Sequence, residues 1–97
     1  MSHRLEDTPP FKKSLKKLIN SGRLNKEQIG KTLKLLKENP FTQSLKTHKV
    51  DTRNYGKVWS SRVDGDLRII WHLDSKDQIL ILLLDIGGHS GSSKVYK

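Results

Sequence analysis

The fold of this chain is decided by residues 57–86, KVWSSRVDGDLRIIWHLDSKDQILILLLDI. Two turn signals, at residues 64–66 (DGD) and 74–77 (DSKD), divide this stretch between its apolar runs. They predict three strands, at Val58–Val63, Leu67–Leu73 and Gln78–Ile86. The third strand is almost entirely apolar, which is typical of a strand covered on both sides. The stretch therefore predicts a small sheet of sequential, mostly antiparallel strands.

The middle strand has two different faces, because successive side chains of a strand point to opposite sides. One face carries Leu67, Ile69, Trp71 and Leu73, and the other carries Arg68, Ile70 and His72. The face of Arg62 depends on the turn before this strand. A three-residue loop places Arg62 opposite Arg68 on one face, whereas a two-residue loop places the two arginines on opposite faces. The sequence leaves this register open.

Two amphipathic helical patterns precede the sheet. The first follows Pro9-Pro10, has its apolar stripe at Phe11, Leu15, Leu18 and Ile19, and ends at residues 20–22. The second begins at a cap, Asn25, and ends at Asn39-Pro40. We expect an antiparallel helix pair, an additional edge strand at Ser2–Glu6, and irregular structure over residues 41–56. The predicted fold is α+β, with an N-terminal two-helix hairpin packed on a small, mostly antiparallel sheet, and residues 1–97 form a single domain.

Positive charge is concentrated before the sheet. The net charge is +9, and residues 11–57 hold thirteen Lys or Arg against three acidic residues, while residues 58–97 hold five of each. This asymmetry favours a polyanionic partner such as RNA, DNA or a ribosome, although an acidic protein would also be attracted.

Several classes of protein are excluded or disfavoured by composition. The chain has no cysteine, which excludes disulfides, thiolate zinc sites and cysteine nucleophiles. No histidine pair has the spacing of metal ligands, so we predict no metal and no cofactor. The longest apolar run, Ile79–Leu84, is too short to span a bilayer, and residues 1–8 lack the apolar segment of a secretory signal. We therefore expect a cytoplasmic protein without membrane contact.

Three residues are candidates for chemistry on a phosphate. Arg68 lies within an apolar strand and offers a phosphate a fixed charge and a planar guanidinium fork. The alternative is that it is a surface arginine on the solvent face of the strand. His89 follows two glycines in a loop, where it would exchange a proton near neutral pH or serve as a polar surface residue. Tyr96 lies in an apolar pair, Val95-Tyr96, after a Gly/Ser-rich stretch. Its hydroxyl would align or deprotonate a nucleophile, or its ring would stack on an RNA base. The alternative is that the pair docks on the protein for packing alone.

The order of helix, helix, basic segment and three strands resembles the RelE/ParE superfamily of bacterial toxin–antitoxin toxins. The resemblance covers nearly the whole chain. It is carried by Leu45-Lys46, by Leu67-Arg68-Ile69-Ile70-Trp71 and by Ile86-Gly87-Gly88-His89-Ser90, the last of which resembles the ending of the YafQ branch. Lys94-Val95-Tyr96 resembles the end of the RelE branch, and Arg62 stands where the YafQ branch has a histidine.

This resemblance implies a ribosome-dependent endoribonuclease that cuts mRNA in the decoding site. In such enzymes the RNA's own 2′-hydroxyl attacks the adjacent phosphate and expels the 5′-oxygen. Arg68 would stabilise the phosphate charge, His89 would be the acid or base, and Tyr96 would orient or deprotonate the nucleophile. The residues expected to bind RNA are Lys46, His48, Lys49, Arg53 and Arg62. The implied partners are mRNA on the ribosome and a cognate antitoxin, with the toxin monomeric alone and hetero-oligomeric with its antitoxin.

Two other functions fit the same residues. One is a ParE-like gyrase inhibitor without nuclease activity, for which a histidine at position 89 has no evident acid–base use. The other is a non-catalytic module that binds RNA or ribosomes, in which binding would weaken steeply with salt.

Overall fold

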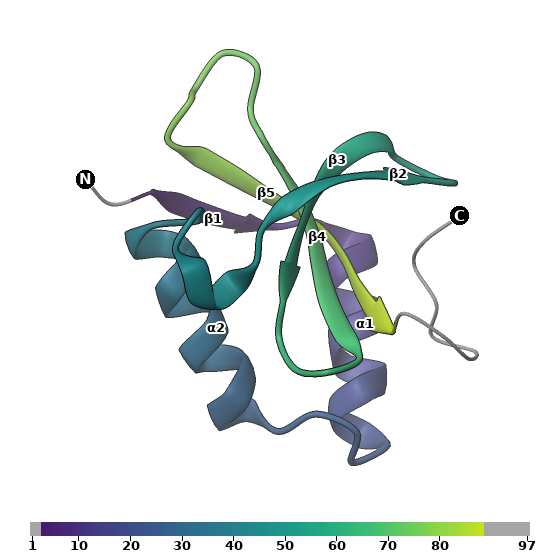
Figure 1. Ribbon diagram of the computed structural model, residues 1–97. Coiled ribbons are helices and arrows are strands. Elements are labelled where there is room, and N and C mark those ends of the chain that lie inside the picture. The colour runs from purple at the N-terminus through teal and green to yellow at the C-terminus, as the bar shows by residue number, and fades with distance from the viewer. Residues whose placement is uncertain (1–2, 89–97) are drawn as a thin grey trace.

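The computed structural model describes residues 3–88, which form an α+β fold of two helices and one five-stranded mixed sheet (Figure 1). The elements are β1 (Arg4–Asp7), α1 (Pro9–Asn20), α2 (Lys26–Glu38), the 3-10 helix η1 (Gln43–Leu45), β2 (His48–Thr52), β3 (Gly56–Arg62), β4 (Leu67–Leu73) and β5 (Leu80–Gly88). The strand order is β1-β5-β4-β3-β2. β1 is parallel to β5, and the other neighbours are antiparallel. Neither helix in this part of the chain is long and apolar enough to cross a membrane.

The helix ends follow from local chemistry. α1 has proline in its first turn, where a missing backbone N–H removes no intrahelical bond. It is followed by Gly22, whose φ of +80° suits a residue without a side chain. α2 begins at the predicted cap, because the side chain of Asn25 accepts a 2.7 Å hydrogen bond from the Gln28 N–H. It ends before Pro40, which cannot continue a helix.

The helices cover one face of the sheet (Figure 1). The core joins Phe11 and Leu18 of α1 and Ile29 and Leu36 of α2 to apolar side chains of β4 and β5, which are Leu67, Ile69, Trp71, Ile81, Leu83 and Ile86. These residues of β4 lie on the face that alternation predicts to be apolar. The other face of β4, which carries Arg68, therefore points away from the helices.

The expectation of irregular structure over residues 41–56 was wrong. The segment contains η1 and the strand β2, which pairs with β3 along its whole length, from His48↔Ser60 to Thr52↔Gly56. An edge strand is held by backbone hydrogen bonds on one side, so a polar sequence such as HKVDT can form it. The expected edge strand near the N-terminus is present as β1, one to two residues later than predicted.

A chain of hydrogen bonds fastens the segment before β2 to the sheet. The buried Trp71 indole N–H donates to Ser61 Oγ at 2.7 Å, and Ser61 Oγ lies 2.6 Å from Thr47 Oγ1. Thr47 in turn donates to the Pro40 carbonyl, which leaves the Ser61 hydroxyl as the donor in the middle bond. The side-chain polar groups of Trp71, Ser61 and Thr47 therefore all have hydrogen-bond partners.

Candidate functional site

The β3–β4 hairpin places Arg62 directly opposite Arg68. The Val63 N–H donates to the Leu67 carbonyl at 2.9 Å, which closes the three-residue loop at residues 64–66. Residues paired directly across antiparallel strands share a face, so both arginines lie on the side turned away from the helices. We call this side the arginine face. Its central members, row by row across the strands, are Arg62, Arg68 and Gly87 in one row and His48, Ser60, Ile70 and Asp85 in the next.

The two guanidinium groups meet at one backbone oxygen. Arg62 Nε donates to the Asp64 carbonyl at 3.2 Å, and Arg68 Nη1 donates to the same carbonyl at 2.7 Å and to the Leu67 carbonyl at 3.0 Å. Within residues 3–88, no carboxylate forms an ion pair with either arginine. Two cations held together in this way form a site for an anion, and the planar guanidinium fork matches the oxygens of a phosphate.

Asp64 holds the turn on which this arrangement depends. Its carboxylate accepts hydrogen bonds from the N–H groups of Asp66 and Leu67, at 2.8 and 2.7 Å, and pairs with Arg23 at 3.0 Å. Burial alone would raise the pKa of Asp64. The bonds from Arg23 and from the two backbone N–H groups outweigh that effect and lower the pKa from 3.8 to about 2. The loop between the helices is thereby tied to the tip of the arginine hairpin.

We expect Asp64 to make the stability of the protein depend on pH in acid. Its folded pKa of about 2 lies below its ordinary 3.8, so the unfolded state binds the proton more tightly. The stability contributed by Asp64 is therefore present above about pH 4 and is lost as the pH falls towards about 2. We expect about 1–2 kcal/mol, because the Arg23 partner is exposed and solvent screens the pair.

Urea unfolding of the wild type and of Asp64→Asn, followed by tryptophan fluorescence, measures this contribution. Asparagine retains an oxygen for the two backbone N–H groups but loses the charge. The wild type should be the more stable protein at neutral pH, and the difference should vanish in the acid range named above. A difference that stays constant with pH would show that the ion pair contributes nothing.

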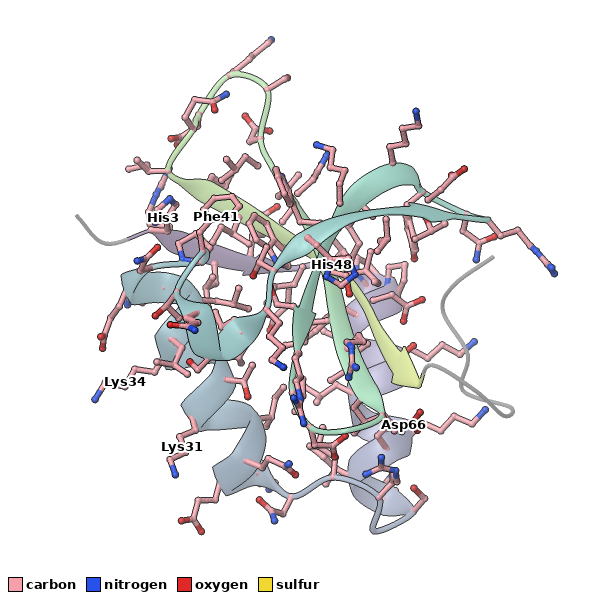
Figure 2. The ribbon with its side chains drawn as sticks, viewed as in Figure 1. His3, Lys31, Lys34, Phe41, His48 and Asp66 are labelled. Carbon is pink, nitrogen blue, oxygen red and sulfur yellow. The ribbon has the colours of Figure 1, made fainter. Side chains whose placement is uncertain are left out.

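His48 lies on the arginine face at the start of β2 (Figure 2). Its Nδ1 is 2.9 Å from the Lys46 carbonyl oxygen, which can only accept, so Nδ1 carries a hydrogen. The other ring nitrogen, Nε2, is then the one available to exchange a proton with a ligand. The exposed ring is thus oriented by the backbone of the residue that closes η1.

The remaining predicted residues lie apart from this face or outside the described chain. Lys49 points to the helix-covered side of the sheet, where its Nζ lies 4.3 Å from the centre of the Trp59 ring. Arg53 is exposed in the β2–β3 turn, and Lys46 is exposed with a left-handed backbone conformation after η1. His89 and Tyr96 lie outside residues 3–88. Arg62, Arg68 and His48 are therefore the predicted residues that the described structure brings to one face.

A groove of about 410 Å³ runs from α2 to the end of β3 and has Arg62 in its wall. Leu35, Leu45 and Val63 provide apolar lining. Lys31 and Lys34 also line the groove and extend outward from α2 (Figure 2). The positive charge of the helices thus continues to the edge of the arginine face.

Sequence reasoning did not single out Tyr55 and Asp85. The Tyr55 hydroxyl reaches from the β2–β3 turn to donate to the Leu84 carbonyl at 3.2 Å. Burial, and then the charge of Asp85, raise the pKa of Tyr55, so its hydroxyl remains a donor at neutral pH. Asp85 had a signal in the sequence, because it is the one charged residue in the apolar stretch 79–88. Tyr55 had none, since its contact joins residues far apart in the chain.

Groups of three or more potential metal ligands are absent from the part of the chain that the structure describes.

The chain matches a family model along residues 3–92, described as "Bacterial toxin of type II toxin-antitoxin system, YafQ". None of the curated proteins matches the sequence.

Solved structures share the fold at low sequence identity. The metal-bound toxin from Helicobacter pylori has a TM-score of 0.71 and 20% identity, covering 90% of this chain and 94% of that one. YafQ from E. coli strain BL21(DE3) has a TM-score of 0.68 and 18% identity, covering 89% and 92%. The toxin chain in the E. coli DinJ-YafQ toxin–antitoxin complex has a TM-score of 0.68 and 18% identity, covering 92% and 94%.

Proposed function

The chain belongs to the YafQ family of bacterial toxins of type II toxin–antitoxin systems, and from this premise we propose that it is a metal-independent endoribonuclease that cleaves mRNA on the ribosome. The observation that carries the proposal is the pair Arg62 and Arg68, opposed on one face and meeting at the Asp64 carbonyl. The planar fork of each guanidinium matches the oxygens of a phosphate, which supports RNA as the target.

The proposed reaction uses the 2′-hydroxyl of the RNA as the nucleophile. Its oxygen attacks the adjacent phosphorus, the bond from phosphorus to the 5′-oxygen breaks, and the products carry a 2′,3′-cyclic phosphate and a 5′-hydroxyl. Arg62 and Arg68 stabilise the negative charge that builds up on the phosphate oxygens in the transition state. His89 exchanges a proton, Tyr96 orients the nucleophile, and His48 lies in the row beside the arginines.

The positive surface supplies attraction to the RNA backbone. Lys46, Lys49 and Arg53 lie around the edge strand β2 and its turn, outside the arginine pair. Phosphate contacts of this kind position an RNA without reading its sequence. We assign these residues to binding, and we expect their loss to weaken association more than the chemical step.

We further propose that a cognate antitoxin binds this toxin in the cytoplasm and holds it inactive as a hetero-oligomer. The E. coli relative of known structure is bound in the DinJ-YafQ complex, which supports such a partner. A net charge of +9 favours an acidic partner that covers the basic surface.

Primer extension on an mRNA in a translating cell-free extract tests the nuclease. New 5′ ends should appear after the wild-type toxin is added, should require ribosomes, and should be absent with the double variant Arg68→Ala/His89→Ala. Toxicity that leaves mRNA intact and depends on gyrase would contradict the proposal, as would ribosome binding without cleavage.

A further inference from the structure

β5 contains a bulge beside the arginine face. Trp71 pairs with Leu83 and Ile70 pairs with Asp85, so Leu84 is one extra residue in β5. If the register had continued without the extra residue, Asp85 would stand opposite Ile69, which is completely buried in the core. The bulge instead turns Asp85 to the arginine face and lets Ile86 enter the core. It therefore decides where the only charged side chain of β5 points.

The bulged backbone is held from two sides. The Tyr55 hydroxyl donates to the Leu84 carbonyl from the β2–β3 turn, and the Thr8 hydroxyl contacts the same oxygen at 3.4 Å from the start of α1. Thr8 also donates to the Leu83 carbonyl at 2.7 Å. The carbonyl groups at the bulge accept these hydrogen bonds, so side chains from other parts of the fold stabilise the bulge.

Asp85 is a diagonal neighbour of Arg68. Arg68 pairs directly with Gly87, which adds no side chain, and Asp85 lies two residues further along β5 on the same face. Diagonal neighbours of this kind have Cα atoms about 7–8 Å apart, within reach of one bound nucleotide. One carboxylate oxygen of Asp85 accepts from the Ile86 N–H at 2.8 Å. Within residues 3–88 this is the hydrogen bond that the Asp85 carboxylate makes, and the residue is partly exposed.

We infer that Asp85 is a catalytic residue, the general base that takes the proton from the attacking 2′-hydroxyl. The inference rests on the proposed function. A carboxylate beside two arginines would repel the phosphate itself, whereas it accepts a hydrogen bond from a hydroxyl next to that phosphate. As the 2′-oxygen bonds to phosphorus, its proton passes to Asp85, and the departing 5′-oxygen receives a proton from the acid, His89. Solvent then returns both groups to their starting states.

Tyr55 is a positioning residue in this arrangement. Its hydroxyl is committed to the Leu84 carbonyl, and its raised pKa keeps that hydroxyl protonated. It therefore acts through the backbone that aims Asp85 and does not compete for the proton of the RNA.

Purified toxin acting on mRNA in ribosome complexes tests the assignment through Asp85→Asn. The asparagine oxygen still accepts from the Ile86 N–H, but it cannot take a proton from the hydroxyl. We expect the single-turnover cleavage rate to fall by about 100-fold or more. We also expect thermal unfolding to be unchanged and RNA affinity to be equal or higher, because a negative charge has been removed. A merely structural residue would lose stability together with rate.

A modified mRNA with sulfur in place of the scissile 5′-oxygen distinguishes the general base from the general acid. The thiolate leaves without being protonated, so cleavage of this mRNA needs the base but not the acid. The modified mRNA should restore cleavage by His89→Ala but not by Asp85→Asn.

Asp85→Glu is the second variant, since it keeps the charge while displacing the carboxylate by one methylene. We expect it to fold and to cleave at least about 10-fold more slowly.

Three outcomes would overturn the assignment: Asp85→Asn within about threefold of the wild-type rate, full activity of Asp85→Glu, or rescue of Asp85→Asn by sulfur. In each of them Arg68→Ala would still slow cleavage strongly, so the proposed function would stand. If the wild-type protein itself left mRNA intact, the proposed function would fail first, and the two failures are thereby distinguished.

Discussion

Replacement of Arg68 by alanine is expected to lower the rate of mRNA cleavage by about 100- to 1,000-fold, the effect of removing one preorganised charge from a transition state. Arg68 is fixed by the β4 backbone and by hydrogen bonds to the Asp64 and Leu67 carbonyls. Its charge therefore needs little reorganisation when the phosphate becomes more negative. Single-turnover cleavage of mRNA in ribosome complexes measures the loss.

Two controls make the Arg68 result specific. Arg68→Lys keeps the charge but loses the planar fork, so we expect an intermediate rate. Arg4→Ala removes the same charge from the edge strand β1, where Arg4 pairs with Asp77, and should cleave at the wild-type rate. Equal losses in Arg4→Ala and Arg68→Ala would mean that only net charge matters, which would remove the support for a phosphate site at the arginine pair.

A double-mutant cycle with Arg62→Ala tests whether the two arginines act as a unit. They meet at one carbonyl, so a single phosphate would contact both. We expect the double variant to lose less than the product of the two single losses, because removing one arginine already disrupts the shared site. Full additivity would place the arginines on different phosphates.

Much of the fold was readable from turns and periodicity. The turn at residues 64–66, the alternation of β4 and the cap at Asn25 are local signals, and each predicts structure within a few residues of itself. The strand β2 was missed because its stability comes from backbone pairing with β3, which leaves little mark on the polar sequence HKVDT.

The site was harder to predict because it depends on register. The sequence allowed Arg62 on either face, and the ladder to β4 decides between them. The bulge at Leu84 was not predicted, because the apolar residues before it do not distinguish the two faces of β5, although Asp85 stands out after them as a charge. The pair between Arg23 and Asp64 joins residues 41 positions apart, beyond any local pattern.

The largest expected change in stability follows Phe11→Ala. Phe11 is completely buried in the shared core of helices and sheet, and its removal leaves a cavity beneath α1. Such substitutions cost about 3–5 kcal/mol. A domain of this size has about 5–15 kcal/mol in total, so the variant should retain only a fraction of its stability. We expect the melting temperature, measured by circular dichroism, to fall by at least about 12 °C.

Phe41→Ala is the matched control, because it deletes the same side chain from a position that is 50% exposed. Phe41 makes edge contacts with Trp59 and Trp71, so we expect a loss of about 1 kcal/mol and no more. Phe11→Leu should lie between the two, since leucine refills much of the cavity. If Phe41→Ala were as damaging as Phe11→Ala, the contribution of these two side chains to the free energy of unfolding would not follow their burial.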